Sequence, residues 1–392
     1  MLFPVILLFL ASSPASDASL RAGLIALEKN DLAQARLNLE NAAKLAPSDP
    51  KAWVGLAQTF WKLHDASGAN EAAAKAEILG SQDAAVQHAL SVYYAETNQF
   101  EKAGDAEANY SRGVPTDRGA VLHSMTFYIK GGRADRAITL AKASPDWSNR
   151  ADVHNLLGKA YFANKQPDEA ANEFRSAIRL SPYEESYYFD FAQALLVQQK
   201  FEDAIGVLQE GKTNFDKSAQ IQLALGVAYY GLRRFEEAAT AFLRTIALAP
   251  DVEQPYVFLG KMLDQIPEKL PELTRVFSDY EKSNPSNYLG YRLHAQALDA
   301  QSGDAATAER LLRKAISLND GDAQAYFELG TLMEKERRFP EAAEALERAA
   351  ALNGNDAATH YRLARVYDRL GKRDAARLER DEHARLLKST EK

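Results

Sequence analysis

One stretch of the sequence has the spacing of a phosphate-binding loop. Gly206 and Gly211 stand five residues apart. Lys212 and Thr213 follow directly and complete the pattern GxxxxGK[ST]. Such a loop wraps nucleotide phosphates with its backbone N–H groups, and it requires a buried strand before it and a helix after the threonine. Neither is expected here, because the whole segment is rich in helix-forming residues.

The histidines are spread along the chain rather than gathered into one site. None belongs to an HExxH motif, and no two have the spacing of metal ligands on one helix. We interpret them as scattered surface or groove residues, and we expect no metal, no cofactor and no bound nucleotide. The seven are His64, His88, His123, His154, His294, His360 and His383.

Acidic and basic side chains also define no catalytic group. Carboxylates such as Glu236 and Glu341 stand at positions expected to face solvent, where a charged surface explains them. The segment between Arg362 and Arg377 is locally basic but interleaved with acidic residues, which is typical of a salt-bridged surface. We therefore expect a protein without catalytic residues, which is not an enzyme.

The composition favours an all-α protein that is stabilised by packing alone. Of the 392 residues, 46% are hydrophobic, and strong helix formers dominate long stretches. The absence of cysteine excludes disulfides and zinc–thiolate sites. The net charge of −7 argues against nucleic acid as a partner, because phosphate binding requires a basic surface.

A repeat of about 34 residues organises the sequence, and its clearest copy lies between Asn155 and Pro182. The same frame recurs downstream at Leu225-Gly226 and at Leu329-Gly330. This pattern resembles the tetratricopeptide repeat (TPR). The resemblance implies an all-α TPR solenoid, a right-handed superhelix of antiparallel helix pairs. In the clearest copy it rests on Leu157, Gly158, Tyr161, Ala170, Phe174, Ala177 and Pro182.

The frame predicts about eleven repeats across residues 16–388. An alanine marks the second helix in ten of the eleven, and a small residue marks the first helix in nine, with exceptions at Met125 and Gln296. In this frame Gly211 falls inside a second helix, which removes the phosphate-loop interpretation. The predicted repeats begin near residues 16, 50, 84, 118, 151, 185, 219, 253, 289, 323 and 357.

Two departures from the repeat predict joints in the array. The fourth repeat is one residue short and ends in an irregular segment, which places a possible joint near 144–150. The eighth repeat has Pro267 and Pro271 where the turn between its helices belongs, which places another near 265–271.

The N-terminus has the character of a secretory leader. Residues 1–10 form a continuous apolar run, and small residues follow up to Ala15. We predict a signal peptide at 1–15 and an exported protein, periplasmic or secreted, with a cytoplasmic protein as the alternative. Ten apolar residues are too short to span a bilayer, so we expect no membrane insertion of the mature chain.

The TPR resemblance implies a non-catalytic scaffold or adaptor that binds a partner polypeptide in a concave groove lined by the first helices. The alternative is an accessory subunit that provides substrate recognition or assembly for a separate enzyme or envelope complex. A carboxylate-binding clamp of the TPR type is not expected, because Asp190 follows Asn155 and Lys159 where a basic residue is needed.

The groove-facing positions of the first helices are more apolar in repeats four to seven than in repeats eight to eleven. A contiguous apolar strip on a surface usually marks an interaction site, so we predict the peptide-binding groove there. Self-association through the same strip is the other possibility. The predicted groove residues are Leu122, Ile129, Asn155, Lys159, Phe162, Phe189, Gln193, Leu196, Leu223, Val227 and Tyr230.

Overall fold

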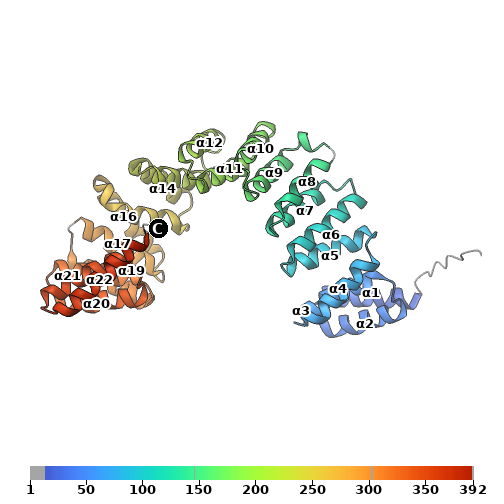
Figure 1. The fold of residues 1–392 in the computed structure, drawn as a ribbon, viewed down its shortest axis with the longest axis horizontal. Coiled ribbons are helices and arrows are strands. Elements are labelled where there is room, and N and C mark those ends of the chain that lie inside the picture. Colours follow the sequence, from blue (N-terminus) through green and yellow to red (C-terminus); the bar gives the residue numbers. More distant parts are fainter. Residues whose placement is uncertain (1–13, 145, 302, 391–392) are drawn as a thin grey trace, which may run out of the picture. The chain divides into compact units, whose positions relative to one another are not determined.

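A computed structural model describes residues 14–144, 146–301 and 303–390. Within these ranges every regular element is a helix, which confirms the predicted all-α class (Figure 1). None of the helices in the described ranges combines the length and apolar character needed to cross a membrane. The predicted signal peptide, residues 1–15, lies outside the described residues except for Pro14 and Ala15, which begin the first helix.

The chain divides into two compact units, and each is described by itself. The N-terminal half extends to Ala194, and the C-terminal half begins at Leu195, inside helix α11 (Glu185–Val197). The helices before α11 are α1 (Pro14–Glu28), α2 (Leu32–Leu45), α3 (Pro50–Lys62), α4 (Ala66–Leu79), α5 (Ala84–Glu96), α6 (Phe100–Gly113), α7 (Arg118–Lys130), α8 (Ala134–Ala143), α9 (Ala151–Ala163) and α10 (Pro167–Leu180), with a 3-10 turn η1 (Trp147–Asn149).

The C-terminal half continues the alternation of short helices. Its elements are α12 (Phe201–Asn214), α13 (Ala219–Gly231), α14 (Phe235–Leu248), α15 (Glu253–Lys261), the 3-10 turns η2 (Leu263–Gln265) and η3 (Pro267–Lys269), α16 (Leu270–Ser283), α17 (Tyr288–Ala300), α18 (Ala305–Leu318), α19 (Ala323–Lys335), α20 (Phe339–Leu352), α21 (Ala357–Arg369) and α22 (Arg373–Thr390).

Consecutive helices alternate as the first and second helices of the repeats, here called pairs 1 to 11 (Figure 1). Within a pair the two helices pack together as a hairpin, as α1 does with α2 and α19 with α20. A small residue on the first helix lets the two backbones approach. A Cβ atom added to Gly158 would lie 2.7 Å from the ring of Phe174, and one added to Gly226 would lie 2.4 Å from the ring of Phe242. Both rings are fully buried, so the small residue and the large one form a single packing unit.

Stacking brings the first helices together within each half. In the N-terminal half α1 contacts α3, α3 contacts α5, and α7 contacts α9. In the C-terminal half the same relation joins α15, α17, α19 and α21. Second helices contact the first helix of the next pair, as α2 does with α3. The first helices of each half therefore form a shared surface, here called the first-helix face.

In nine of the pairs the turn between the two helices contains one described residue with a left-handed backbone. It is Asn30 in pair 1, with φ 57°, and Gly371 in pair 11, with φ 75°. In pair 8 the equivalent residue is Pro267, whose ring fixes φ near −65°. The left-handed turn cannot form there, and the 3-10 turns η2 and η3 replace it. The other left-handed turn residues are His64, Asn98, Gly132, Lys165, Gln199, Arg233 and Arg337.

The fourth residue of many first helices bonds to the loop that precedes the helix. Trp53 Nε1 donates to Pro47 O at 3.0 Å, and the hydroxyl of Tyr256 donates to Pro250 O at 3.1 Å. His154 and His360 occupy the same position, each with Nε2 at 3.1 Å from the carbonyl oxygen six residues earlier. Both histidines are buried. Their interpretation as surface or groove residues is therefore wrong, and they have a structural role.

Pair 9 explains one exception in the repeat. Helix α17 begins at Tyr288, one residue before the predicted start of that repeat. Ala295, which is fully buried, consequently occupies the small-residue position that the sequence frame gave to Gln296. Gln296 moves to the next position, on the first-helix face.

Candidate functional site

The predicted groove residues all lie on first helices, and the two halves of the chain carry separate sets. In the N-terminal half they are Leu122 and Ile129 on α7, Asn155, Lys159 and Phe162 on α9, and Phe189 and Gln193 on α11. In the C-terminal half they are Leu196 at the end of α11, and Leu223, Val227 and Tyr230 on α13. The prediction that they line a groove stays a prediction.

The apolar members of both sets are half-buried rather than fully exposed. The ring of Tyr230 meets those of Phe235 and Phe258 edge to face, with centroids 5.8 and 5.1 Å away. Leu223 and Val227 pack against the same buried cluster of the C-terminal half. Core packing therefore uses part of each side chain, and the remainder stays available to a ligand.

The polar members on α9 are engaged with Asp190 of α11. Asp190 Oδ2 accepts a hydrogen bond from Asn155 Nδ2 at 2.7 Å and lies 2.6 Å from Lys159 Nζ. Asn155 and Lys159 are therefore both engaged with a carboxylate of the chain itself. Asn155 Oδ1 is buried and has no hydrogen-bond partner among the described residues.

The first-helix face of the N-terminal half has further apolar side chains that the sequence analysis did not select. Leu24 on α1, Trp61 on α3 and Val92 on α5 are between 37% and 40% exposed. They stand at the repeat positions used to predict the groove, so the signal was present. Apolar groove positions therefore also occur in the first three repeats.

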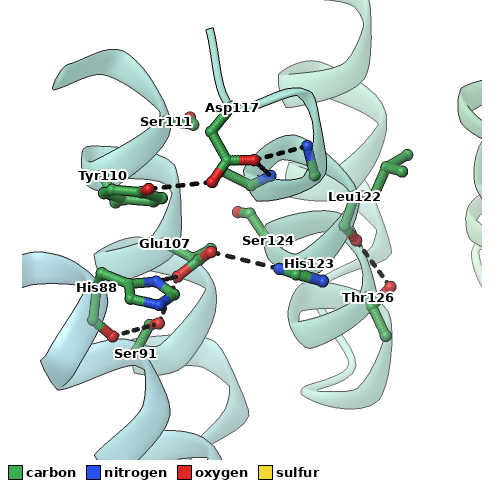
Figure 2. A network of polar contacts seen from close by, with 12 residues as sticks. His88, Ser91, Glu107, Tyr110, Ser111, Asp117, Leu122, His123, Ser124 and Thr126 are labelled. Carbon is green, nitrogen blue, oxygen red and sulfur yellow. Dashed lines mark hydrogen bonds and ion pairs between the residues drawn. The ribbon is translucent and has the colours of Figure 1, made fainter. Parts of the chain in front are cut away.

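A buried carboxylate lies between three helices of the N-terminal half (Figure 2). Glu107 on α6 is 1% exposed, at the position that Phe174 and Phe242 occupy in other pairs. Its Oε2 accepts a hydrogen bond from the Ser91 hydroxyl and lies 3.1 Å from His88 Nδ1, both on α5. From α7, His123 Nδ1 lies 3.6 Å from Oε1, an atom without a hydrogen-bond partner among the described residues.

A second polar contact ties α6 to the start of α7. The Tyr110 hydroxyl donates to Asp117 Oδ2 at 3.0 Å, while Asp117 Oδ1 accepts from the N–H groups of Gly119 and Ala120 (Figure 2). This hydrogen bond stabilises the neutral hydroxyl of Tyr110 beside the ionised carboxylate of Asp117. It therefore lowers the pKa of Asp117 and raises the pKa of Tyr110. Asp117 thus caps α7 as a carboxylate.

The Glu107 cluster has the composition of a catalytic site but not the arrangement of one. The Ser91 hydroxyl donates to the Glu107 carboxylate and not to the imidazole of His88, so the serine–histidine hydrogen bond of a Ser–His–carboxylate triad is not formed. Among the described residues no group of three or more acidic, histidine or cysteine side chains is placed to hold a metal ion. The sequence signal that was missed is a glutamate at a core position of the repeat.

The C-terminal half contains a second buried carboxylate. Arg292 on α17 is shared between Asp322 Oδ2 at 3.1 Å and Glu328 Oε1 at 3.2 Å, and all three side chains are at most 14% exposed. Burial raises the pKa of Glu328 to about 7, because one guanidinium compensates only part of the lost hydration of two carboxylates.

The residues of the apparent phosphate loop take no such form. Gly206, Gly211 and Lys212 all lie inside α12, which extends to Asn214. Their backbone N–H groups are directed along the helix, so they do not converge on a ligand.

Three family models match this chain. Two are described as tetratricopeptide repeat, and they match residues 20–89 with 189–253, and residues 151–184. The third, described as the C-terminal ARM domain of tetratricopeptide repeat protein 21, matches residues 268–374.

Curated relatives are similar over a quarter of the chain. DnaJ homolog subfamily C member 7 from Homo sapiens is 31% identical over 98 residues, which are 25% of this chain and 20% of that protein. The Hsp70-Hsp90 organising protein of Plasmodium falciparum is 25% identical over 105 residues, or 25% of this chain and 18% of that protein. The match spans about a fifth of each relative's length.

Solved structures align over most of the chain at low identity. Yeast Tom70 has a TM-score of 0.41 and 16% identity, covering 95% of this chain and 92% of that one. A chain of the APC/C hetero-tetramer Cut9-Hcn1 has a TM-score of 0.43 and 14% identity, covering 95% and 94%.

Proposed function

Because the chain belongs to the tetratricopeptide repeat family, we propose that it is a non-catalytic scaffold or adaptor that binds a partner polypeptide on its first-helix face. One observation carries the proposal: the apolar side chains at the groove positions keep part of their surface outside the core. Such surface usually marks an interaction site. The similarity to a protein named for organising Hsp70 and Hsp90 fits an adaptor role.

In this proposal the N-terminal half binds its ligand through Leu122, Ile129, Phe162 and Phe189. Asn155 and Lys159 are held in place by Asp190 and give the surface a fixed polar element beside the aromatic rings. Gln193 is exposed on the same helix as Phe189 and is free of core packing. The side chains of α13 would have the same role in the C-terminal half.

The proposed partner is a protein or peptide and not a nucleic acid, since the net charge of −7 opposes phosphate binding. We propose an exported protein on the strength of the apolar run at residues 1–10 and the small residues after it. A cytoplasmic location and self-association are the alternatives, which fractionation and sedimentation distinguish.

Replacement of the two aromatic anchors tests the proposal. Anchoring aromatic side chains contribute about 2 kcal/mol or more each to an interface. The Phe162→Ala, Phe189→Ala double variant should therefore bind the captured partner more than tenfold more weakly while keeping its helical circular dichroism. The partner would first be identified by affinity capture from the native fraction, and binding would then be measured with purified proteins.

The matched control is Leu37→Ala with Ile78→Ala, which removes apolar side chains that are 61% and 78% exposed on second helices. This control should bind normally. Equal losses in the two double variants would remove the basis for placing the site on the first helices.

A further inference from the structure

The first-helix face of the C-terminal half contains a polar cavity outside the predicted groove residues. It has a volume of about 240 Å³ and is lined from successive first helices and η2. Glu328, Thr331 and Lys335 of α19 line it together with Gln296 of α17 and Lys261 of α15. Part of it borders the short helix α15, which ends early because of the proline turn in pair 8.

Three oxygen atoms of the lining residues are buried without a hydrogen-bond partner among the described residues. They are Gln296 Oε1, Glu328 Oε2 and Thr331 Oγ1, and Thr331 as a whole is only 8% exposed. Gln296 Nε2 donates to Gly260 O at 3.2 Å, which fixes the orientation of the amide and leaves its oxygen as the unpaired atom. The amide oxygen of Gln296 and the ionised carboxylate of Glu328 only accept hydrogen bonds, and the Thr331 hydroxyl can accept as well as donate, so the cavity suits a ligand that donates.

Several cations around the cavity are already paired with carboxylates. Lys335 Nζ lies 2.6 Å from Asp299 Oδ2, and Arg362 Nη1 lies 3.1 Å from Glu334 Oε2. Lys261 and Asp264, which have opposite charges, also line the cavity, and Lys261 Nζ lies over the ring of Phe258. Arg292 reaches Glu328 only through Oε1. Of the three unpaired oxygens, Glu328 Oε2 belongs to a carboxylate, which favours a cation.

On the basis of the proposed function, we infer that this cavity takes the ammonium group of a lysine side chain from the partner polypeptide. An ammonium group has three N–H donors, one for each unpaired oxygen. Its charge pairs with Glu328, and its alkyl stem packs on Phe327 and Leu332, which also line the cavity.

The test uses n-butylammonium, the terminal fragment of a lysine side chain, with the full chain at a pH above 7, where Glu328 is ionised. Saturation-transfer NMR should show saturable binding in the millimolar range, and the same titration with butyrate or n-butanol should show none. Thr331→Val removes one acceptor without changing the shape and should weaken binding at least fivefold. Glu328→Gln removes the charge and should abolish it.

Thr240→Val is the matched control, because this threonine is also inside a helix of the C-terminal half but lies outside the cavity. It should bind n-butylammonium like the natural chain. Absence of saturable binding, tighter binding of butyrate, or undiminished binding by Thr331→Val would overturn the inference.

The outcome separates this inference from the proposed function. If n-butylammonium does not bind but binding of the partner still depends on Phe162 and Phe189, only the cavity assignment is overturned. If n-butylammonium binds normally but binding of the partner does not depend on Phe162 and Phe189, only the proposed site on the N-terminal half is overturned.

Discussion

Glu107 is a carboxylate at a position where other pairs bury an apolar side chain. Ser91 and His88 provide its hydrogen-bond contacts on one oxygen, and the other oxygen has none among the described residues. A buried carboxylate with incomplete partners generally lowers stability compared with an apolar residue of similar volume. We therefore expect Glu107 to lower the stability of pair 3.

Replacing this carboxylate should stabilise the protein. Leu39 and Leu346 fill the equivalent position opposite small residues, so Glu107→Leu should fit opposite Ser91. We expect the free energy of unfolding to rise by about 1–2 kcal/mol, measured by urea unfolding followed by circular dichroism. Glu107→Gln keeps a polar group in the core and should give no gain. A clear loss of stability in Glu107→Leu would mean that the network stabilises the fold.

The raised pKa of Glu328 predicts that the stability of the folded chain depends on pH. Its pKa is raised to about 7 in the folded chain, whereas the ordinary value is 4.5. Between these pH values the folded chain holds a proton that the unfolded chain has lost, so stability should fall as pH rises from 4.5 to 7. The effect amounts to as much as about 3 kcal/mol, and Glu328→Gln should lack it.

Urea unfolding at several pH values measures this difference. Glu336→Gln, an exposed glutamate at the end of the same helix, is the control and should behave like the natural chain. If the free energies of unfolding of the natural chain and of Glu328→Gln differ by the same amount from pH 4.5 to 7.5, Glu328 does not have a raised pKa in solution.

Among single residues, the sequence predicted some contacts and missed others for physical reasons. The positions of Gly158 and Phe174 follow from backbone approach, which the repeat encodes directly. The pairing of Asp190 with Lys159 depends on how neighbouring repeats stack, which residue spacing alone does not give. Half-burial of Phe162 and Phe189 depends on the same stacking, so the groove residues remain a prediction.

At the scale of elements, the turn between the two helices of most pairs requires a left-handed backbone, which restricts the residues that fit there without strain. Lys165 adopts a left-handed conformation with φ 58°, although this region is disfavoured for residues with a Cβ atom. Replacing it with glycine should stabilise the protein by about 1 kcal/mol, because the strain of the left-handed residue is removed. Urea unfolding measures the change.

Lys165→Ala is the control for this prediction. Alanine removes the side chain but keeps the Cβ atom, so it should give no stabilisation. A gain in Lys165→Ala equal to that in the glycine variant would assign the effect to the lysine side chain instead of the backbone.

The helices themselves were predictable because each repeats the same requirements of packing, capping and turning. The irregular turn of pair 8 was also visible in the sequence as two prolines, and the structure supplies the reason through the left-handed position that Pro267 cannot adopt. The one-residue shift of α17 also had a signal in the sequence, because Asn287, a preferred capping residue, stands directly before Tyr288 as Asp322 stands before α19. Counting in steps of 34 residues does not use that signal.

At the scale of the whole molecule, each pair depends mainly on its neighbours. Leu363 and Tyr367 of α21 belong to a buried cluster completed by Ala376 of α22. Stability in such an array is approximately a sum of local terms. Removing the chain after Arg373 should therefore expose α21 and reduce protection in α19 and α20, while leaving the N-terminal half unchanged.

Hydrogen exchange followed by mass spectrometry measures protection helix by helix. The expected result is a gradient of lost protection from α21 toward α15. Equal loss of protection in α1 to α10 would show that the array unfolds as one cooperative unit and would contradict the local description.

Three of the left-handed turn residues are also sites at which trypsin can cleave the chain. The turn residues Lys165, Arg233 and Arg337 are all exposed and basic, so they are substrates for trypsin at equivalent points of three pairs. Cleavage there separates the two helices of a hairpin instead of separating one hairpin from the next. The two internal fragments, 166–233 and 234–337, would begin with a second helix and end with a first helix. Each internal fragment would have, at both of its ends, one helix that is no longer covalently joined to the other helix of its pair. These helices could pair again only by non-covalent packing.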